Sequence, residues 1–292
     1  MYCKELTSEN IQEFLALFDT VLTDCDGVLW HGSSALPGSP ETIQKLHTMG
    51  KRIFYITNNS TKSRDDYLIK FTNMGFPATK DSVVGSGYVA AQYVKYQLEY
   101  NGKVFVVGSK GIEKELAEAD NLDGLSFDDM SKLELDPDIN CVIVGLDTQF
   151  SYLKLARAIS YLAKDGCHFV ATNTDTGLPI GSGKVLPEAA AQRKADVICG
   201  KPYPLIYETL SQQHRINPDR SLVIGDRLDT DIQLAGRCHL HSLLVLTGFS
   251  TLPDVDHLME HGSEEDKLQI PEYYIKSLED LGKLITEFQA SN

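Results

Sequence analysis

Two aspartates separated by a single residue, Asp24 and Asp26, follow the short run 20–23 (TVLT). Carboxylates held this close raise each other's pKa unless a cation neutralises them. A carboxylate so placed can attack phosphorus and form an aspartyl phosphate, which divides one difficult displacement into two easier steps. We therefore predict that Asp24 is a nucleophile. We predict that Asp26 is a general acid and base, which protonates the leaving alkoxide and later takes a proton from water.

A second acidic motif, GDRLDTD, occupies residues 225–231 at the end of another apolar run. Asp226 and Asp231 suit Mg²⁺, because this ion prefers hard oxygen ligands and binds few protein carboxylates. We expect Asp24 to share the ion and the backbone carbonyl of Asp26 to be a further ligand. Such an ion would neutralise the acidic residues and polarise the oxygens of a phosphoryl group.

Neutral donors and one cation complete the candidate site. The segment 57–60 (TNNS) follows a third apolar run, and Lys201 follows a fourth. Thr57 and Asn58 can bind phosphoryl oxygens through a hydroxyl and a backbone N–H, and Asn59 can add its side-chain amide. Lys201 provides a point charge that binds phosphate and keeps the nucleophile ionised.

Other motifs receive no catalytic role. Asp229 is explained by the helix dipole, which favours acidic residues in a first turn, and Arg227 can pair with a neighbouring acid. Trp30 is expected to pack or to shape the rim of the pocket. The Gly-x-Gly pairs at 85–87 and 181–183 lack the spacing of a dinucleotide site, and no P-loop motif occurs.

These residues need a scaffold that brings several strand ends together. Continuous apolar runs alternate with helical patterns, which predicts strands buried on both faces of a parallel sheet, hence an α/β fold. In open α/β sheets, ligands bind at the carboxyl ends of the strands. The predicted strands span 20–24, 52–57, 103–107, 141–145, 168–172, 196–199, 221–225 and 242–246.

Helix ends can be located in the same way. Ser151 is expected to cap a helix that ends before Gly166. The polar segment 256–266 is expected to be a surface loop, and a final helix is expected at about 277–288.

The positions of the acidic and phosphate-binding motifs predict an interrupted domain. These motifs lie outside the stretch 95–195, which carries its own strand–helix units. We therefore expect a core formed by residues 1–94 and 196–292, with residues 95–195 inserted as a second domain.

Composition restricts the class of protein. The chain has 292 residues and a formal net charge of −14, which argues against binding of nucleic-acid backbones or of membranes through basic patches. Its six cysteines form no paired metal-binding spacing. With no signal-type segment and no long apolar run, the sequence predicts a cytoplasmic protein.

Four motifs together resemble those of the haloacid dehalogenase (HAD) superfamily phosphatases. They occur at residues 24–30 (DCDGVLW), 57–60 (TNNS), 200–202 (GKP) and 225–231 (GDRLDTD), and the similarity runs from about residue 18 to the C-terminus. The residues of these motifs are similar to those of the branch that contains phosphoglycolate phosphatase, pyridoxal phosphate phosphatase (chronophin) and para-nitrophenylphosphatase. The resemblance implies a Rossmann-like core, Mg²⁺ dependence and an inserted α/β cap of the C2 type, which matches residues 95–195. It also implies a homodimer formed through the cap.

In this branch a loop of the cap selects the substrate, and residues 171–179 (ATNTDTGLP) match it. The pattern T-N-x-D is more similar to the phosphoglycolate and para-nitrophenyl members. Animal pyridoxal phosphate phosphatases tend to carry a histidine in this loop, and none occurs here between His168 and His214. We therefore expect 2-phosphoglycolate or a related small metabolite as substrate, with pyridoxal 5′-phosphate as the alternative.

Two other classes of protein share some of these residues. A phosphoacceptor receiver domain also uses an aspartate at a strand end, but it lacks an inserted cap and has no need of a second aspartate at the position of Asp26. An inactive scaffold would not be expected to retain Asp24, Asp26, Lys201 and Asp226.

Overall fold

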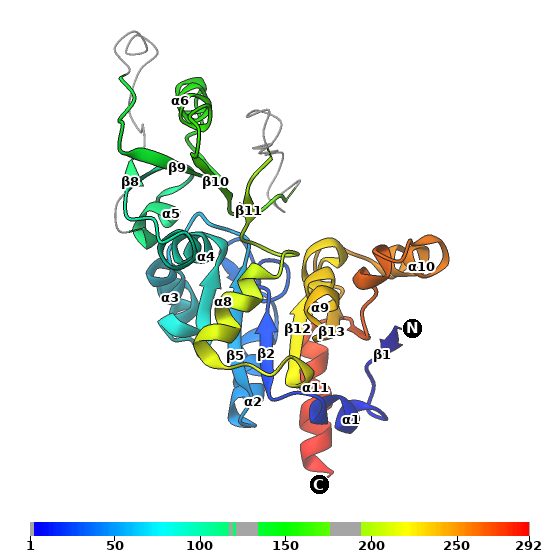
Figure 1. The fold of residues 1–292 in the computed structure, drawn as a ribbon. Helices are drawn as coiled ribbons and strands as arrows, with labels where there is room; N and C mark the ends of the chain where they lie inside the picture. Colours follow the sequence, from blue (N-terminus) through cyan, green and yellow to red (C-terminus); the bar gives the residue numbers. More distant parts are fainter. Residues whose placement is uncertain (1–2, 117–118, 121–133, 176–193, 292) are drawn as a thin grey trace. The chain divides into compact units, whose positions relative to one another are not determined.

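The structure is a computed structural model, and it describes residues 3–116, 119–120, 134–175 and 194–291. The chain divides into two compact units. The first comprises residues 1–57, 68–84 and 201–292, and the second comprises residues 58–67 and 85–200. Each unit has a β-sheet of its own, so each is described separately (Figure 1).

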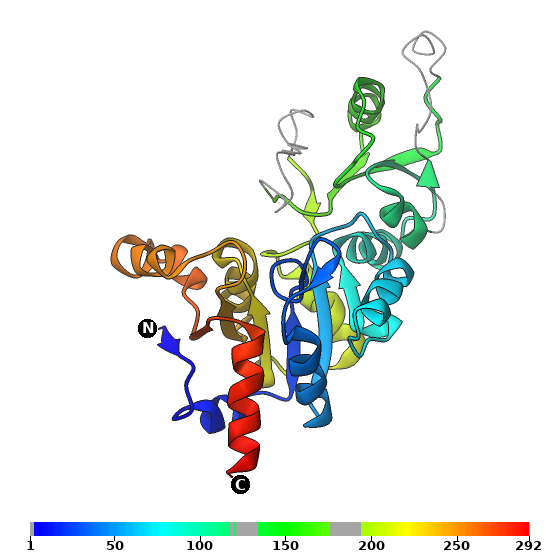
Figure 2. The same cartoon turned by 180° about the vertical axis from the view of Figure 1, so that it is seen from behind.

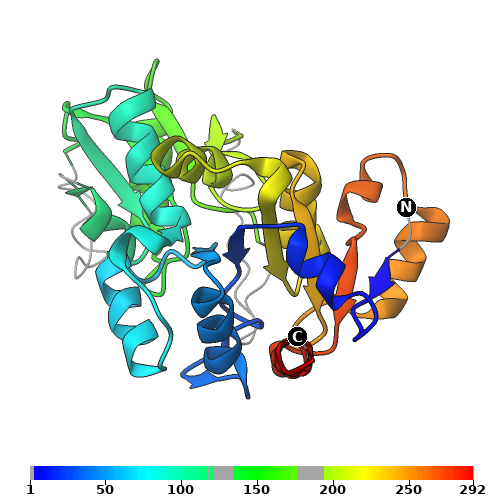
Figure 3. The same ribbon diagram turned by 90° about the horizontal axis from the view of Figure 1, so that it is seen from below.

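The first unit contains a seven-stranded sheet in the order β1-β14-β13-β12-β2-β5-β6. From β1 to β5 every neighbouring pair is parallel, and in Figure 3 β1 lies beside β14 at the edge of the sheet. The strands span Lys4–Glu5 (β1), Thr20–Thr23 (β2), Arg52–Thr57 (β5), Val83–Gly85 (β6), Ser221–Gly225 (β12), His241–Val245 (β13) and Tyr273–Ile275 (β14).

The order in which successive strands are added to this parallel sheet reverses between β2 and β12. From β2 the chain continues to β5 on one side, whereas β12 is followed by β13 and β14 on the other. The register aligns Thr23 of β2 with Ile224 of β12 and with Tyr55 of β5. The residues that follow these three strands therefore leave the sheet at one edge, where open α/β sheets bind their ligands.

Helices cover both faces of the first sheet. Figures 1 and 2 show α2 and α11 on one face and α8 and α9 on the other. Thr42 of α2 donates from its hydroxyl to the carbonyl of Leu278 at 2.7 Å, which fixes α11 against α2. The helices of this unit span Ile11–Ala16 (α1), Ser39–Thr48 (α2), Leu205–His214 (α8), Gln233–Cys238 (α9), Leu252–His261 (α10) and Leu278–Ala290 (α11), and α3 (Arg64–Asn73) contributes its second half.

The second unit contains a five-stranded parallel sheet in the order β11-β10-β9-β7-β8. Its core joins Phe105 and Phe169 of the strands to Leu153 and Tyr161 of α6. The strands span Lys103–Val107 (β7), Ala119–Asp120 (β8), Ile139–Val144 (β9), His168–Ala171 (β10) and Val197–Ile198 (β11), and the helices span Ser86–Gln92 (α4), Lys110–Glu115 (α5) and Tyr152–Leu162 (α6). A short antiparallel pair, Trp30–His31 (β3) with Ser34–Ala35 (β4), lies outside both large sheets.

The eight predicted strands are confirmed, with shifts of one or two residues at some ends. Ser151 caps α6 by accepting a hydrogen bond from the backbone N–H of Lys154, as its position predicted. The predicted loop at 256–266 is wrong in its first half, because residues 252–261 form α10. Thr251 and Asp254 form a capping box at the start of this helix, and Val255 anchors it in the core. Among the described residues, no helix is long and apolar enough to cross a membrane.

Candidate active site

The two aspartates of the first motif lie directly after β2, in a tight turn. The backbone N–H of Asp24 continues the sheet by donating to the carbonyl of Ile224 at 2.8 Å. Gly27 then turns the chain with a φ of +89°. A Cβ at Gly27 would lie 2.6 Å from Oδ2 of Asp226, so this turn has both a conformational and a steric reason for glycine.

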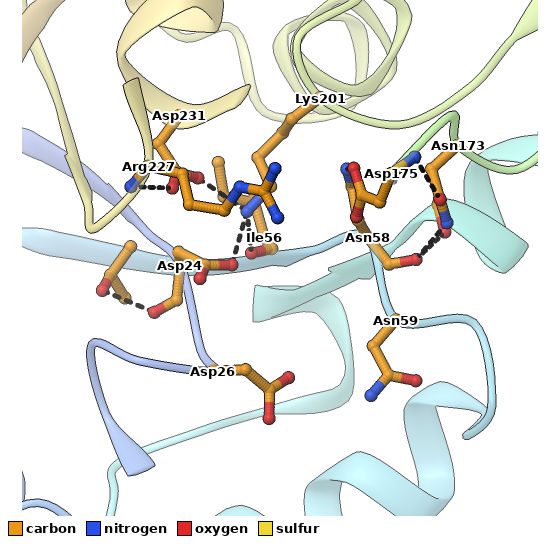
Figure 4. Close-up of polar contacts among 12 residues, drawn as sticks. Asp24, Asp26, Ile56, Asn58, Asn59, Asn173, Asp175, Lys201, Arg227 and Asp231 are labelled. Carbon is orange, nitrogen blue, oxygen red and sulfur yellow. Dashed lines mark hydrogen bonds and ion pairs between the residues drawn. The ribbon is translucent and has the colours of Figure 1, made fainter. Parts of the chain in front are cut away.

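Four charged side chains meet where the strands of the first sheet end: Asp24, Asp226, Asp231 and Lys201, all of them buried. The Lys201 ammonium contacts the carboxylate of Asp24 and that of Asp231, the latter at 2.7 Å between Nζ and Oδ1 (Figure 4). The same Nζ donates to the backbone carbonyl of Ile56 at 3.4 Å. Sequence reasoning placed these four residues in one site, and the structure brings them together.

Burial and mutual repulsion determine the protonation of this cluster. Burial raises the pKa of Asp24 well above its usual range; Lys201 opposes this shift, and the charges of the two other carboxylates increase it. Burial, with repulsion from Asp231, raises the pKa of Asp226 to about 7. Burial lowers the pKa of Lys201, but Asp231 and Asp24 outweigh this effect and raise it above its usual value. Lys201 is therefore a permanent cation that cannot by itself balance three carboxylates.

The donor set fits a small divalent cation. One carboxylate oxygen from each of Asp24, Asp226 and Asp231 lies within 4.8 Å of the others. Oδ1 of Asp226 is buried without a hydrogen-bond partner among the described residues, whereas Oδ1 of Asp231 has the Lys201 ammonium 2.7 Å away. A buried anionic oxygen without a hydrogen bond carries a large desolvation penalty, which a bound cation would remove. Three hard carboxylate ligands of this kind are suited to Mg²⁺.

Asp26 lies beside this cluster in a different environment. Its side chain is half-buried, and its Oδ1 accepts a hydrogen bond from the indole Nε1 of Trp30 at 2.8 Å. Within the described part of the chain, the Asp26 carboxylate is not one of the three grouped donors. The backbone carbonyl of Asp26 as a metal ligand stays a prediction.

Backbone donors from the segments after β13 and β12 hold the carboxylates of Asp226 and Asp231. The N–H of Phe249 donates to Oδ2 of Asp226 at 2.8 Å, and the N–H of Arg227 donates to Oδ2 of Asp231 at 3.2 Å. Asp229 is exposed and pairs with the Arg227 guanidinium at 2.7 Å. The guanidinium also lies 4.5 Å from the centre of the Phe249 ring.

The predicted phosphate donors are divided between the two units. Thr57 is buried at the end of β5 in the first unit. Asn58 and Asn59 begin the second unit. The Oδ1 of Asn59 accepts hydrogen bonds from the N–H and the hydroxyl of Thr61, so this oxygen stabilises a local turn. The geometry of the second unit therefore does not by itself place Asn59 in a binding role.

Asn58 is held by the segment that follows β10. Its Nδ2 donates to Oδ1 of Asp175 at 2.9 Å, and its carbonyl accepts from Nδ2 of Asn173 and from the hydroxyl of Ser86, both at 2.8 Å (Figure 4). Sequence reasoning assigned this T-N-x-D segment to substrate selection and missed its link to Asn58. The remainder of the predicted loop, residues 176–179, lies outside the described residues, as does the Gly-x-Gly pair at 181–183.

Two hydrogen-bond donors of the candidate site were not predicted from the sequence. The indole donor of Trp30 was expected only to pack, and the backbone N–H of Phe249 had no sequence signal at all. A tryptophan four residues after a candidate acid, in a turn closed by glycine, is the one signal that could have indicated the first contact.

Comparison with known proteins is consistent with this geometry. Residues 21–121 match the model of the haloacid dehalogenase-like hydrolases, and residues 198–281 match a second model of HAD-like hydrolases. Human glycerol-3-phosphate phosphatase is 40% identical, over 96% of this chain and 94% of its own length. The 4-nitrophenylphosphatase of Schizosaccharomyces pombe is 37% identical, over 96% and 99%, and mouse chronophin is 33% identical, over 96% and 97%.

A solved structure shows the same fold. The glycerol phosphate phosphatase of Mycobacterium tuberculosis, in complex with magnesium, superimposes with a TM-score of 0.73 at 26% identity. The match covers 91% of this chain and 77% of that one.

Proposed function

The chain belongs to the haloacid dehalogenase-like hydrolase family and is a phosphatase, and from this premise we propose that it hydrolyses small phosphomonoesters with Mg²⁺, through an aspartyl phosphate on Asp24. The observation that carries this proposal is the buried cluster of three carboxylates and one ammonium at the switch point of the first sheet. Bound Mg²⁺ would supply charge neutralisation and a Lewis acid for the phosphoryl oxygens. Asp24, Asp226 and Asp231 are the residues that would hold it.

The residues divide the reaction into two steps. First, a carboxylate oxygen of Asp24 forms a bond to phosphorus while the bond from phosphorus to the leaving oxygen breaks, and Asp26 gives its proton to that oxygen. Then water attacks phosphorus, gives its proton to Asp26, and the bond to Asp24 breaks with release of phosphate. Lys201 favours the ionised form of Asp24 and can bind a phosphoryl oxygen, and Thr57, Asn58 and Asn59 are proposed as further donors.

The proposed substrate is a small aliphatic phosphomonoester. 2-Phosphoglycolate is favoured by the T-N-x-D segment, two of whose polar residues, Asn173 and Asp175, are fixed on Asn58. Glycerol 3-phosphate is the second candidate, because relatives named glycerol-3-phosphate phosphatase reach 40% identity. Pyridoxal 5′-phosphate, which has an aromatic ring unlike the two aliphatic esters, is the alternative, and the similarity to chronophin supports it.

We further infer that residues 95–195 act as a C2-type cap, that the protein forms a homodimer through it, and that it works in the cytoplasm. The last inference is supported by the six cysteines, all of which are free thiols. Size-exclusion chromatography with light scattering tests the dimer.

The decisive measurement is kcat/KM for 2-phosphoglycolate, glycerol 3-phosphate and pyridoxal 5′-phosphate, with Mg²⁺ and with EDTA. Metal-dependent turnover with a large preference for one aliphatic ester supports the proposal. A preference for pyridoxal 5′-phosphate overturns the substrate but not the reaction. Stoichiometric retention of phosphate without release would instead indicate a phosphoacceptor domain.

A further inference from the structure

The chain contains a single tryptophan, Trp30, and its side chain is fully buried. A buried indole N–H requires an acceptor, because an unpaired polar group in the interior carries a desolvation penalty. The acceptor here is Oδ1 of Asp26, at 2.8 Å from Nε1. The residue proposed as general acid and base is therefore the partner of the only indole in the protein.

Packing fixes the direction in which this indole donates. The rings of Phe71 and Phe76 contact it edge-on, with centroids 5.0 and 5.9 Å away. The ammonium of Lys70 lies 3.9 Å from the ring centre. This dense packing opposes rotation of the ring and holds it with its N–H directed at Asp26.

The backbone of Trp30 also closes the turn around Asp26. Its N–H donates to the carbonyl of Cys25 at 3.2 Å, and its carbonyl accepts from the N–H of Gly27 at 2.9 Å. One residue therefore bonds to the residue before Asp26, to the residue after it and to its side chain. Both the backbone position and the carboxylate orientation of Asp26 are determined by Trp30.

We propose that Trp30 is a positioning residue for proton transfer: its indole N–H holds one oxygen of Asp26 so that the other is presented to the leaving oxygen. The inference rests on the proposed function, since Asp26 has a proton to deliver only if a phosphoester is cleaved. In that step the electron pair of the breaking P–O bond stays on the leaving oxygen, which takes the proton from Asp26. A basic alkoxide depends on this proton, whereas 4-nitrophenolate is stable without it.

The test is an isosteric deletion of the N–H. Because Trp30 is the sole tryptophan, incorporation of 3-benzothienylalanine in place of tryptophan replaces this one N–H by sulfur and retains a ring of nearly the same size. The parameter to compare is kcat/KM, which reports formation of the phosphoenzyme and not the later attack of water. For the best aliphatic phosphate of the substrate panel we expect kcat/KM to fall about tenfold, a fraction of the 10²–10⁴ attributed to general acid–base catalysis. For 4-nitrophenyl phosphate we expect a change of less than about threefold, because its departure needs little proton transfer.

Two further variants separate positioning from packing. Phe76→Leu loosens the same aromatic cluster and leaves the N–H in place, so it is expected to affect both substrates alike. In an Asp26→Asn background the benzothienyl substitution is expected to have no further effect on the aliphatic substrate, because coupled residues are not additive. Trp30→Phe, a genetic variant, is expected to show the same dependence on the leaving group.

An equal loss on the aliphatic and the aryl phosphate, or full additivity with Asp26→Asn, overturns the inference and leaves the proposed function standing. Failure of the unmodified enzyme to hydrolyse any phosphomonoester with Mg²⁺ overturns the proposed function, and the inference falls with it.

Discussion

At the scale of single residues, Asp24 is the group whose loss is expected to stop the reaction. Asp24→Asn keeps the size of the side chain and its contact with Lys201 but removes the nucleophilic oxygen. We expect turnover to fall below detection, with an unchanged circular dichroism spectrum. Rapid quenching with a ³²P-labelled substrate should trap a phosphoenzyme in the wild type and none in the variant. Retained turnover in the variant would exclude Asp24 as the nucleophile.

Asp226 is expected to make metal-free stability depend on pH. Its pKa is about 7 in the folded protein and near 3.8 when unfolded, so the folded state binds this proton more tightly. Stability of the metal-free protein should therefore decrease as pH rises from about 4 to about 7, and the ionised form is destabilised by roughly 2–4 kcal/mol. Asp24, whose pKa is also raised, contributes a dependence of its own, so Asp226→Asn should remove only the share of Asp226 and raise the melting temperature at pH 8 in EDTA.

Mg²⁺ provides the control for Asp226. It should raise the melting temperature of the wild type at pH 8, because binding to the folded state alone stabilises it, and it should not stabilise Asp226→Asn. If both proteins respond equally to Mg²⁺, Asp226 is not a ligand.

At the scale of elements, the turn after β2 is expected to tolerate no side chain at Gly27. Gly27→Ala places a methyl group 2.6 Å from Oδ2 of Asp226 in a residue with a φ of +89°. Gly50→Ala is the matched control, because its φ is +81° and its added Cβ would meet nothing within 4 Å. Both should lose about 1–2 kcal/mol of stability through the left-handed backbone. Only Gly27→Ala should also lose stabilisation by Mg²⁺ and activity, and equal losses in the two would show that the contact with Asp226 has no effect.

At the scale of the whole molecule, the second unit contains a buried ion pair that tests its independence. Nζ of Lys154 lies 2.9 Å from Oδ2 of Asp147, and the side chains are 2% and 3% exposed. Lys154→Met leaves a buried carboxylate without its cation and should destabilise this unit by about 3–5 kcal/mol. Lys103→Met breaks the exposed pair with Asp136 in the same unit and should change stability by less than about 1 kcal/mol.

Hydrogen exchange shows where Lys154→Met acts. Amides of β7, β9 and β10 should lose protection, while those of β2, β12 and β13 keep it. Equal loss in both sheets would mean that the two units unfold as one cooperative body.

Much of this architecture could be predicted from the sequence, since short continuous apolar runs that alternate with helical patterns indicate buried parallel strands. The strands that escaped prediction, such as β1 and β3, have two residues each, which is too short for any period to be visible. The helix at 252–261 was not predicted because its composition is largely polar. A capping box and one buried valine stabilise it.

The candidate site could be predicted from the sequence because its side chains follow strand ends, and ligands bind at the carboxyl ends of the strands in open α/β sheets. The contacts of Trp30 with Asp26 and of Asp175 with Asn58 could not be predicted from the sequence. The first depends on a turn of only a few residues, and the second joins residues 117 positions apart. Neither local propensity nor periodicity carries such information.

The lone indole of Trp30 gives the protein an intrinsic optical probe at its proposed active site. Excitation at about 295 nm selects tryptophan, so all of this emission comes from a ring that touches Asp26 and lies beneath the Lys70 ammonium. Emission from an indole shielded from water should be blue-shifted. Changes in the field around Asp26 on metal or phosphate binding should alter its intensity, so stopped-flow fluorescence could follow the chemical steps in the unlabelled enzyme.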